Sequence, residues 1–287
     1  MVLPGTAALG PRQPGLLGAL AASCHPGPVV AVTTLATVLA VAVGAGPASL
    51  VVLLAFLAGQ LSVGWSNDWL DAARDAAAGR SDKPVAVGAV TARTVRRAAV
   101  AAAAATVVLS SALGWRAGLA HTVGVAAAWA YNAGLKSTVW SWAPYAVFFG
   151  LLPVVVIVAL PGHPWPPPWM IVAGALLGVG AHLINVLPDL EDDRSTGVRG
   201  LPHRLGRTGS GVLAPVVLVV ASAVVVAGAR GGLGVGGWAV LGVVALVAAL
   251  GAVAAATGHR RLALAATAVV ALADVALLIA SGDAVTV

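Results

Sequence analysis

The chain has 287 residues, of which 60% are hydrophobic and only 9% are charged. A soluble domain has about a quarter of its residues charged, so this chain has too few polar side chains to cover a surface that faces water. Its formal charge of +6 comes from basic residues scattered between apolar runs, without the aromatic-interleaved basic stripe of a nucleic-acid-binding protein. We therefore expect an all-α, polytopic membrane protein in contact with membrane lipid, with no nucleic-acid partner.

The first 27 residues are rich in Gly, Pro and Ala. We expect residues 1–27 to form a flexible leader, within which 16–23 could make a short surface helix. We expect no signal peptide, because a basic segment and a cleavage site are not evident. Residues 28–287 then form a single transmembrane domain. Cys24 is the single cysteine and can form no intrachain disulfide.

Apolar stretches dominated by Ala and Val recur along the rest of the chain. Because about 20 apolar residues cross a bilayer as a helix, these stretches predict a bundle of about nine transmembrane helices. The Gly and Ser residues among them let membrane helices approach each other closely. The predicted spans are 28–45, 47–66, 97–114, 117–134, 143–161, 168–187, 211–229, 235–256 and 262–281.

The lysine and arginine residues predict the orientation of the chain. If the N-terminus lies in the cytosol, 14 of the 16 basic residues fall in inner segments, and only Arg116 and Arg230 fall outside. Cytoplasmic loops carry such an excess of Lys and Arg. The Ala-, Val-, Gly- and Arg-rich composition suggests a high-GC bacterium, so we expect the bacterial inner membrane. The predicted inner loops are 66–97, 134–143, 188–210 and 257–261.

The first inner loop carries four of the ten acidic residues, and its sequence from Asn67 to Asp75 is N-D-W-L-D-A-A-R-D. On a helix, Asp68, Asp71 and Asp75 lie on one face, which Asn67 joins. Like charges at this spacing repel each other unless a cation lies among them. Oxygen ligands at this density suit Mg²⁺, which binds through a few carboxylates together with substrate phosphates.

Four more acidic residues lie in the inner loop at 188–210. Asp189 and Asp193 are neighbours on one helical face, and Pro188 can kink the end of the preceding span. Each acidic cluster follows an even-numbered span, so both open on the same side of the membrane. Together they predict a site for two or three Mg²⁺ ions, completed by a diphosphate. The predicted metal ligands are Asp68, Asp71, Asp75, Asp189, Asp192 and Asp193.

Basic residues close to the two clusters have a chemical role in this interpretation, because cations stabilise the charge that develops on a leaving diphosphate. The arginines at 93, 96, 97, 260 and 261 are explained by orientation alone. The residues expected to bind the diphosphate are Asn67, Arg80, Lys83, Lys136, Asn185 and Arg194.

Three further features have open roles. His182, two turns before Asp189, is expected to pack within the bundle, although it could also face a cavity. Asp274 lies inside the last span, where it could be a functional acid or a helix-to-helix hydrogen-bond partner. Aromatic faces can stabilise a carbocation as they do other cations, or they can anchor the chain at the interface. The aromatic residues near the inner ends of the spans are Trp65, Trp69, Trp129, Tyr131, Trp140, Trp142 and Tyr145.

The pattern Asn67-Asp68-x-x-Asp71-x-x-x-Asp75, paired with Asp189-x-x-x-Asp193, resembles the signature of the UbiA superfamily of intramembrane prenyltransferases. The match extends to Asn185, to Arg194 and Gly197, to Leu201–Gly206, and to Lys136 after a Tyr. The resemblance covers about residues 28–285. Where the family commonly has Thr, this chain has Gly200, which leaves the shape of the following loop open.

The resemblance implies a nine-helix bundle around a central cavity. In that family, aspartates hold Mg²⁺ and an isoprenyl diphosphate, loss of diphosphate gives an allylic carbocation, and a nucleophilic acceptor captures it. By matching positions, Asp68, Asp71, Asp189 and Lys136 are the expected catalytic residues. The implied activity is Mg²⁺-dependent transfer of an isoprenyl group to a small lipid-soluble acceptor, for which an aromatic ring is the first candidate.

Two other functions remain as alternatives. A terpene cyclase of the same superfamily would quench the cation internally and consume the diphosphate alone, so dependence on an acceptor distinguishes it. A transporter or channel would place its acids near the midplane of discontinuous spans, often in repeated halves. Here the acids lie at span ends on one side, which favours the enzyme.

Overall fold

The computed structural model describes residues 15–229 and 234–281, and these residues form helices and no strands. The prediction of an all-α polytopic membrane protein is confirmed. The helices are α1 (Leu16–Ser23), α2 (Pro26–Ala42), α3 (Ala48–Ala77), α4 (Ala92–Ser111), α5 (Trp115–Ala133), α6 (Ala143–Val158), α7 (Pro168–Val186), α8 (Leu190–Ser195), α9 (Leu201–Gly228), α10 (Gly234–Ala256) and α11 (Arg260–Ala280). A short 3₁₀ helix, η1 (Leu135–Ser137), follows α5.

Each predicted span coincides with one long helix within the described residues, and α1 forms where a short helix was allowed. Within the described residues, five helices can cross a membrane by length and composition, namely α3, α7, α9, α10 and α11. A sixth span results if α1 and α2, which meet at a 68° bend, are counted together. The other three helices at predicted spans are too polar or too short to be counted: α4 has three arginines in its first six residues, α5 carries Arg116, His121 and Asn132, and α6 has only 16 residues. The count of nine spans stays a prediction.

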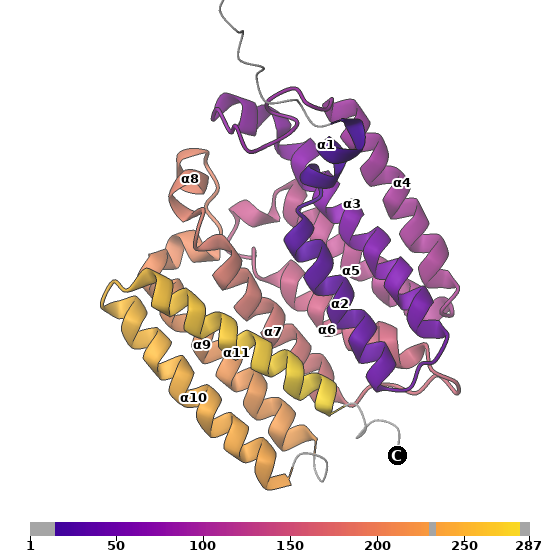
Figure 1. Cartoon of the computed structure of the whole chain (residues 1–287), viewed down its shortest axis with the longest axis vertical. Helices are drawn as coiled ribbons and strands as arrows, with labels where there is room; N and C mark the ends of the chain where they lie inside the picture. The colour runs from indigo at the N-terminus through magenta and orange to yellow at the C-terminus, as the bar shows by residue number, and fades with distance from the viewer. Residues whose placement is uncertain (1–14, 230–233, 282–287) are drawn as a thin grey trace, which may run out of the picture.

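The long helices pack side by side in one bundle (Figure 1). Helices α2, α3 and α5 pack together, α6 packs on α5 and α7, and α11 contacts both α7 and α2. The last three helices form a layer against α7. Glycines allow the closest approach: a Cβ added at Gly178 of α7 would lie 2.4 Å from the Tyr145 carbonyl of α6. Small residues at helix contacts are expected in a membrane bundle, where van der Waals packing drives association.

Two helices extend beyond the predicted spans and thereby position the polar residues. Helix α3 has 30 residues, which is about 45 Å at 1.5 Å per residue, whereas the hydrocarbon core of a bilayer is about 30 Å thick. Its last turns, with the first acidic motif, therefore project past the apolar layer. Helix α9 starts ten residues before its predicted span, with a kink at Gly206, whose φ of 73° favours glycine.

Candidate active site

Two adjoining cavities lie among α2, α3, α5, α6 and α7. The first has a volume of about 450 Å³ and is lined mainly by polar and charged residues. The second, of about 360 Å³, has a mainly apolar lining that includes Phe148 and Phe149. The two cavities share wall residues, including Gln60, Tyr131 and Asn132, so they lie side by side. A polar chamber next to an apolar one suits a ligand with a charged head and a hydrocarbon tail.

The first acidic motif lies on one face of α3, as its spacing predicts. Asp68, Asp71 and Asp75 are all buried, with exposed fractions of 2%, 6% and 5%. Asn67, Asp71 and Asp75 line the polar cavity. Asp68 is not part of that lining and lies beside it, on the side that faces Lys83. Buried carboxylates are costly unless cations and hydrogen bonds compensate them. Asp68 and Asp71 form close ion pairs, whereas the cation paired with Asp75, the Arg74 guanidinium, lies 3.9 Å away.

Asp71 is neutralised by two cations. The Lys136 ammonium donates to both of its carboxylate oxygens at 2.6 and 2.5 Å, and the Arg74 guanidinium lies 2.8 Å away. Lys136 belongs to η1, which the left-handed Gly134 (φ 151°) sets off from α5. Burial lowers the pKa of Lys136, and the Asp71 carboxylate opposes this shift. Lys136, which was predicted to bind the diphosphate, therefore contacts the first acidic motif directly.

Hydrogen bonds of two asparagine side chains connect α5 to the same face of α3. The Asn67 amide donates to the Asp71 carboxylate at 3.1 Å and to the side-chain amide oxygen of Asn132, Oδ1, at 3.3 Å. Asn132 in turn donates to the Val63 carbonyl and to the Ser66 hydroxyl, at 2.9 and 2.8 Å. Asn132 was not among the predicted site residues. The one signal in the sequence that could have predicted Asn132 is its position four residues before Lys136, at the inner end of the same predicted span.

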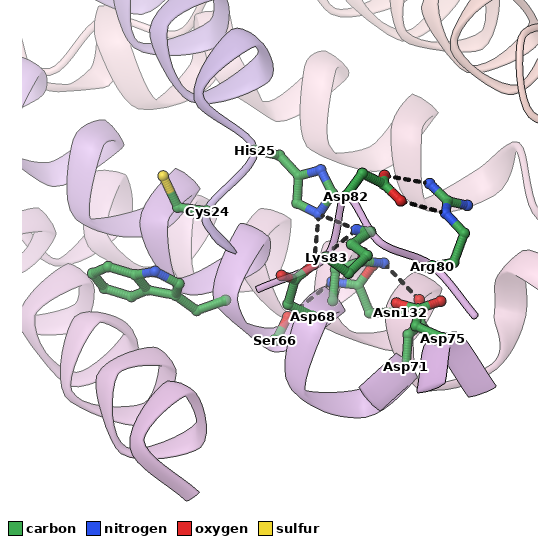
Figure 2. Close-up of polar contacts among 12 residues, drawn as sticks. Cys24, His25, Ser66, Asp68, Asp71, Asp75, Arg80, Asp82, Lys83 and Asn132 are labelled. Carbon is green, nitrogen blue, oxygen red and sulfur yellow. Dashed lines mark hydrogen bonds and ion pairs between the residues drawn. The ribbon is translucent and has the colours of Figure 1, made fainter. Parts of the chain in front are cut away.

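The segment between α3 and α4 brings two more cations to the cavity (Figure 2). Arg80 donates two hydrogen bonds of 2.8 Å to Asp82, and this pairing lowers the pKa of Asp82 to about 2 and raises the pKa of Arg80. Lys83 donates to Asp68 Oδ1 at 2.8 Å. His25, which sequence reasoning did not find, places its Nε2 atom 3.0 Å from both Asp68 Oδ1 and the Lys83 ammonium.

The second acidic motif lies at the junction of α7 and α8. Helix α7 ends at Val186, just before Pro188, and Asp189 is the N-cap residue of α8. Asp189, Asp193 and Asn185 line the polar cavity opposite the α3 face. Asp192 is exposed and lies outside the lining, as does Arg194, which donates to the His203 carbonyl and so joins α8 to α9. The roles predicted for Asp192 and Arg194 stay predictions.

Residues with open roles are placed within the helix packing. His182 is fully buried and its Nε2 lies 3.0 Å from the Ser141 hydroxyl, which accepts a hydrogen bond from the Leu201 amide. The His182 ring lies behind Tyr131 and Tyr145, with centroids 5.7 and 4.8 Å away. Asp274 accepts a hydrogen bond from Ser222 between α9 and α11.

Gly200, where the chain departs from the family pattern, lies against the segment that carries Lys136. An added Cβ would lie 2.4 Å from the Lys136 carbonyl oxygen and 2.8 Å from the Ser141 hydroxyl. A larger residue at position 200 would therefore displace the start of α9 or η1. Of the seven aromatic residues considered for the site, Tyr131 and Tyr145 line one or both of these two cavities, and the five tryptophans line neither.

The donor set fits a hard divalent cation that arrives with its substrate. Within residues 15–229 and 234–281, no three His, Cys, Asp or Glu side chains converge into a metal site on their own. The cavity carboxylates instead face each other from α3 and from the α7–α8 junction, with Lys136 and Arg74 among them. Mg²⁺ binds through one or two carboxylates plus phosphate oxygens, so such carboxylates need not converge beforehand.

Comparison with known proteins gives a consistent result. The model of the UbiA prenyltransferase family matches residues 29–278. The fold is similar to that of a UbiA homolog from Archaeoglobus fulgidus bound to DMAPP and Mg²⁺, with a TM-score of 0.67 and 16% identity over 93% of this chain and 98% of that one. A UbiA homolog from Aeropyrum pernix K1, without ligand, gives 0.68 and 22% over 88% and 97%. A structure of digeranylgeranylglyceryl phosphate synthase gives 0.65 and 14% over 94% and 99%. A search of curated protein sequences found no match.

Proposed function

Because the chain belongs to the UbiA prenyltransferase family, we propose that it transfers an isoprenyl group from an isoprenyl diphosphate to a small lipid-soluble acceptor, with Mg²⁺ as cofactor. The observation that carries this proposal is the pair of adjoining cavities. The polar cavity presents carboxylates from α3 and from the α7–α8 junction, and the apolar cavity shares a wall with it. These chambers match the head and tail of such a donor. Two of the similar structures contain DMAPP or GPP together with Mg²⁺.

The donor diphosphate would lie in the polar cavity. Asp71, Asp75 and Asn67 would face it from α3, and Asp189 and Asp193 from the α7–α8 junction. Mg²⁺, when bound between these carboxylates and the phosphate oxygens, supplies Lewis-acid stabilisation of the leaving group. Lys136, Lys83 and Arg80 add positive charge at the cavity wall, where negative charge develops on the diphosphate. Because these cationic groups are in place before the reaction, no free energy is spent on reorienting them when the charge develops.

The bond between the allylic C1 carbon and the diphosphate oxygen breaks, and its electron pair leaves with the diphosphate. A nucleophilic atom of the acceptor then bonds to C1 and gives up a proton to solvent, so the products are the prenylated acceptor, diphosphate and a proton. The isoprenyl chain would lie among Val32, Phe148 and Phe149, where few polar groups could hold water near the cation. The aromatic face of Tyr131, at the junction of the cavities, is the group best placed to stabilise the allylic cation.

Purified protein in detergent tests the proposal directly. Geranyl, farnesyl and geranylgeranyl diphosphate would each be supplied with Mg²⁺, with and without a panel of aromatic and quinone-precursor acceptors, while diphosphate and organic products are followed. We expect diphosphate release that requires both Mg²⁺ and an acceptor. Release without an acceptor, with a terpene hydrocarbon or alcohol as product, would identify a cyclase instead. No release with these donors or with longer polyprenyl diphosphates would refute the enzyme.

The size of the apolar cavity should limit the length of the donor. Ala128 lines it on α5, one turn before Asn132. We expect Ala128→Trp to lower kcat/KM for geranylgeranyl diphosphate by about tenfold or more, the usual effect of a misfit in an apolar pocket, and to affect dimethylallyl diphosphate much less. Ala126→Trp is the matched control, because Ala126 lies on the same helix, is exposed and lines neither cavity. Equal losses for both donors would contradict the assignment of the tail to this cavity.

We propose further that the polar cavity faces the cytosol across the bacterial inner membrane, which is supported by the distribution of basic residues. In a Cys24→Ser background, Ser81→Cys in the segment between α3 and α4 should react with a membrane-impermeant thiol reagent in inverted vesicles only. Pro161→Cys, between α6 and α7, should react in right-side-out vesicles only. Both positions are exposed. The opposite pattern would reverse the orientation and leave the enzyme assignment intact.

A further inference from the structure

The segment that precedes α2 is part of the active-site wall. Within the described residues, α1 is fixed against α3 by two contacts: the Trp65 indole donates to the Leu20 carbonyl at 2.8 Å, and Gly64 lies directly against the Cys24 backbone. A Cβ added at Gly64 would lie 2.0 Å from the Cys24 carbonyl oxygen. Ala19 of α1 is fully buried, with Val90 and Val95. The corner between α1 and α2 is therefore held in one position.

His25 is the residue at this corner. Its φ of 58° and ψ of 71° are left-handed, which is uncommon for a residue with a Cβ atom. Such a conformation persists where surrounding contacts determine it, and it is concentrated at functional sites. The corner directs the His25 ring to the rim of the polar cavity, beside Asp68 and Lys83, as Figure 2 shows.

The three side chains form a small cluster. An ammonium group has three N–H donors and no acceptor. Lys83 gives one N–H to Asp68 Oδ1 at 2.8 Å, and its ammonium lies 3.0 Å from His25 Nε2. The same Nε2 atom lies 3.0 Å from Asp68 Oδ1, so one tautomer of the ring accepts from Lys83 and the other donates to Asp68. In the tautomer that accepts from Lys83, the third N–H of the ammonium is left to face the polar cavity, which Lys83 lines.

We propose that His25 Nε2 accepts a hydrogen bond from Lys83 and so positions this lysine, and that together with Asp68 it aims the ammonium group at the substrate diphosphate. This inference rests on the proposed function, because it assumes that a diphosphate occupies the polar cavity. A free lysine side chain would lose considerable rotamer entropy on contacting a phosphate. A lysine already held by two acceptors has lost most of that freedom before the substrate arrives. Its contact with the diphosphate therefore strengthens binding more than the same contact from a free lysine side chain would.

Binding of inorganic diphosphate with Mg²⁺, measured by calorimetry on the purified protein in detergent, tests this role without any turnover. We expect His25→Leu to weaken binding by about tenfold, the effect of one hydrogen bond to a charged group. His25→Gln should recover much of the affinity, because its amide oxygen can accept the same N–H. In turnover assays, His25→Leu should raise KM for the donor more than it lowers kcat.

Gly64→Ala provides an independent test that removes no polar group, since the added methyl displaces the Cys24–His25 corner. It should weaken diphosphate binding as His25→Leu does. Two variants are matched controls and should bind like the wild type. They are His163→Leu, at the other left-handed histidine, and Gly242→Ala, where an added Cβ meets nothing within 4 Å.

The outcomes separate this inference from the proposed function. If the wild type binds diphosphate and His25→Leu binds it equally well, the positioning role is refuted and the prenyltransferase stands. If His25→Gln binds no better than His25→Leu while both proteins melt like the wild type, acceptance by the ring nitrogen is refuted. If the wild type does not bind diphosphate with Mg²⁺, both proposals fail together.

Discussion

Asp71→Ala should abolish Mg²⁺-dependent diphosphate release and also lower the stability of the protein. Asp71 and Lys136 are both more than nine-tenths buried and form a direct ion pair. Removing one partner leaves a buried charge without compensation, which costs about 3–5 kcal/mol. Removing a charge that contacts the leaving group or its metal costs about a hundred- to a thousandfold in rate. Thermal unfolding in detergent and release of diphosphate measure the two effects separately.

The double variant Asp71→Ala/Lys136→Met separates folding from catalysis. Replacing a whole buried ion pair by apolar side chains is often neutral for stability. We therefore expect the double variant to melt close to the wild type and still to release no diphosphate. Lys136→Met alone should be the milder single change for stability, because Asp71 keeps Arg74 at 2.8 Å. If turnover returned together with stability in the double variant, Asp71 would have only a structural role.

The features that could be predicted from the sequence are those that depend on local periodicity. The spacing of Asp68, Asp71 and Asp75 places all three on one face of α3 whatever the rest of the fold does, and the structure has them there. Likewise, Pro188 predicted a break near the end of α7, and Asp189 lies at that break. The long apolar stretches correspond to helices for the same reason, since helix length follows from local composition.

What could not be predicted depends on contacts between segments far apart in the chain. His25 lies in a Gly- and Pro-rich stretch that the sequence predicts to be a flexible leader. Its position at the cavity depends on the contacts of Gly64 and Trp65, about 40 residues later, with the Cys24 backbone and the Leu20 carbonyl. Asn132 joins the site only because α5 packs on α3. Arg194 adjoins the second motif in sequence, but the turn after α8 directs it to the His203 carbonyl. No spacing rule contains this information.

The second large effect is expected from the α7–α8 junction. Asp189 occupies the N-cap position of α8, yet its side chain makes no capping hydrogen bond there. Asn is as good an N-cap as Asp, so Asp189→Asn removes a charge from the cavity wall at little cost to the helix. We expect its melting temperature to stay close to that of the wild type, while the Mg²⁺ concentration for half-maximal diphosphate release rises at least tenfold and the maximal rate falls about a hundredfold.

Asp193→Asn should behave in the same way, because Asp193 faces the same cavity from the next turn. Groups that act on one metal-bound substrate are not additive, so the double variant should lose little more than the worse single variant. Glu191→Gln is the matched control: Glu191 lies between the two aspartates but points to Arg207, at 3.3 Å, and its side chain is 69% exposed. Its Mg²⁺ dependence should be unchanged. If all three variants shifted the Mg²⁺ dependence equally, the junction would act through its general negative charge, and no particular carboxylate there would hold the metal.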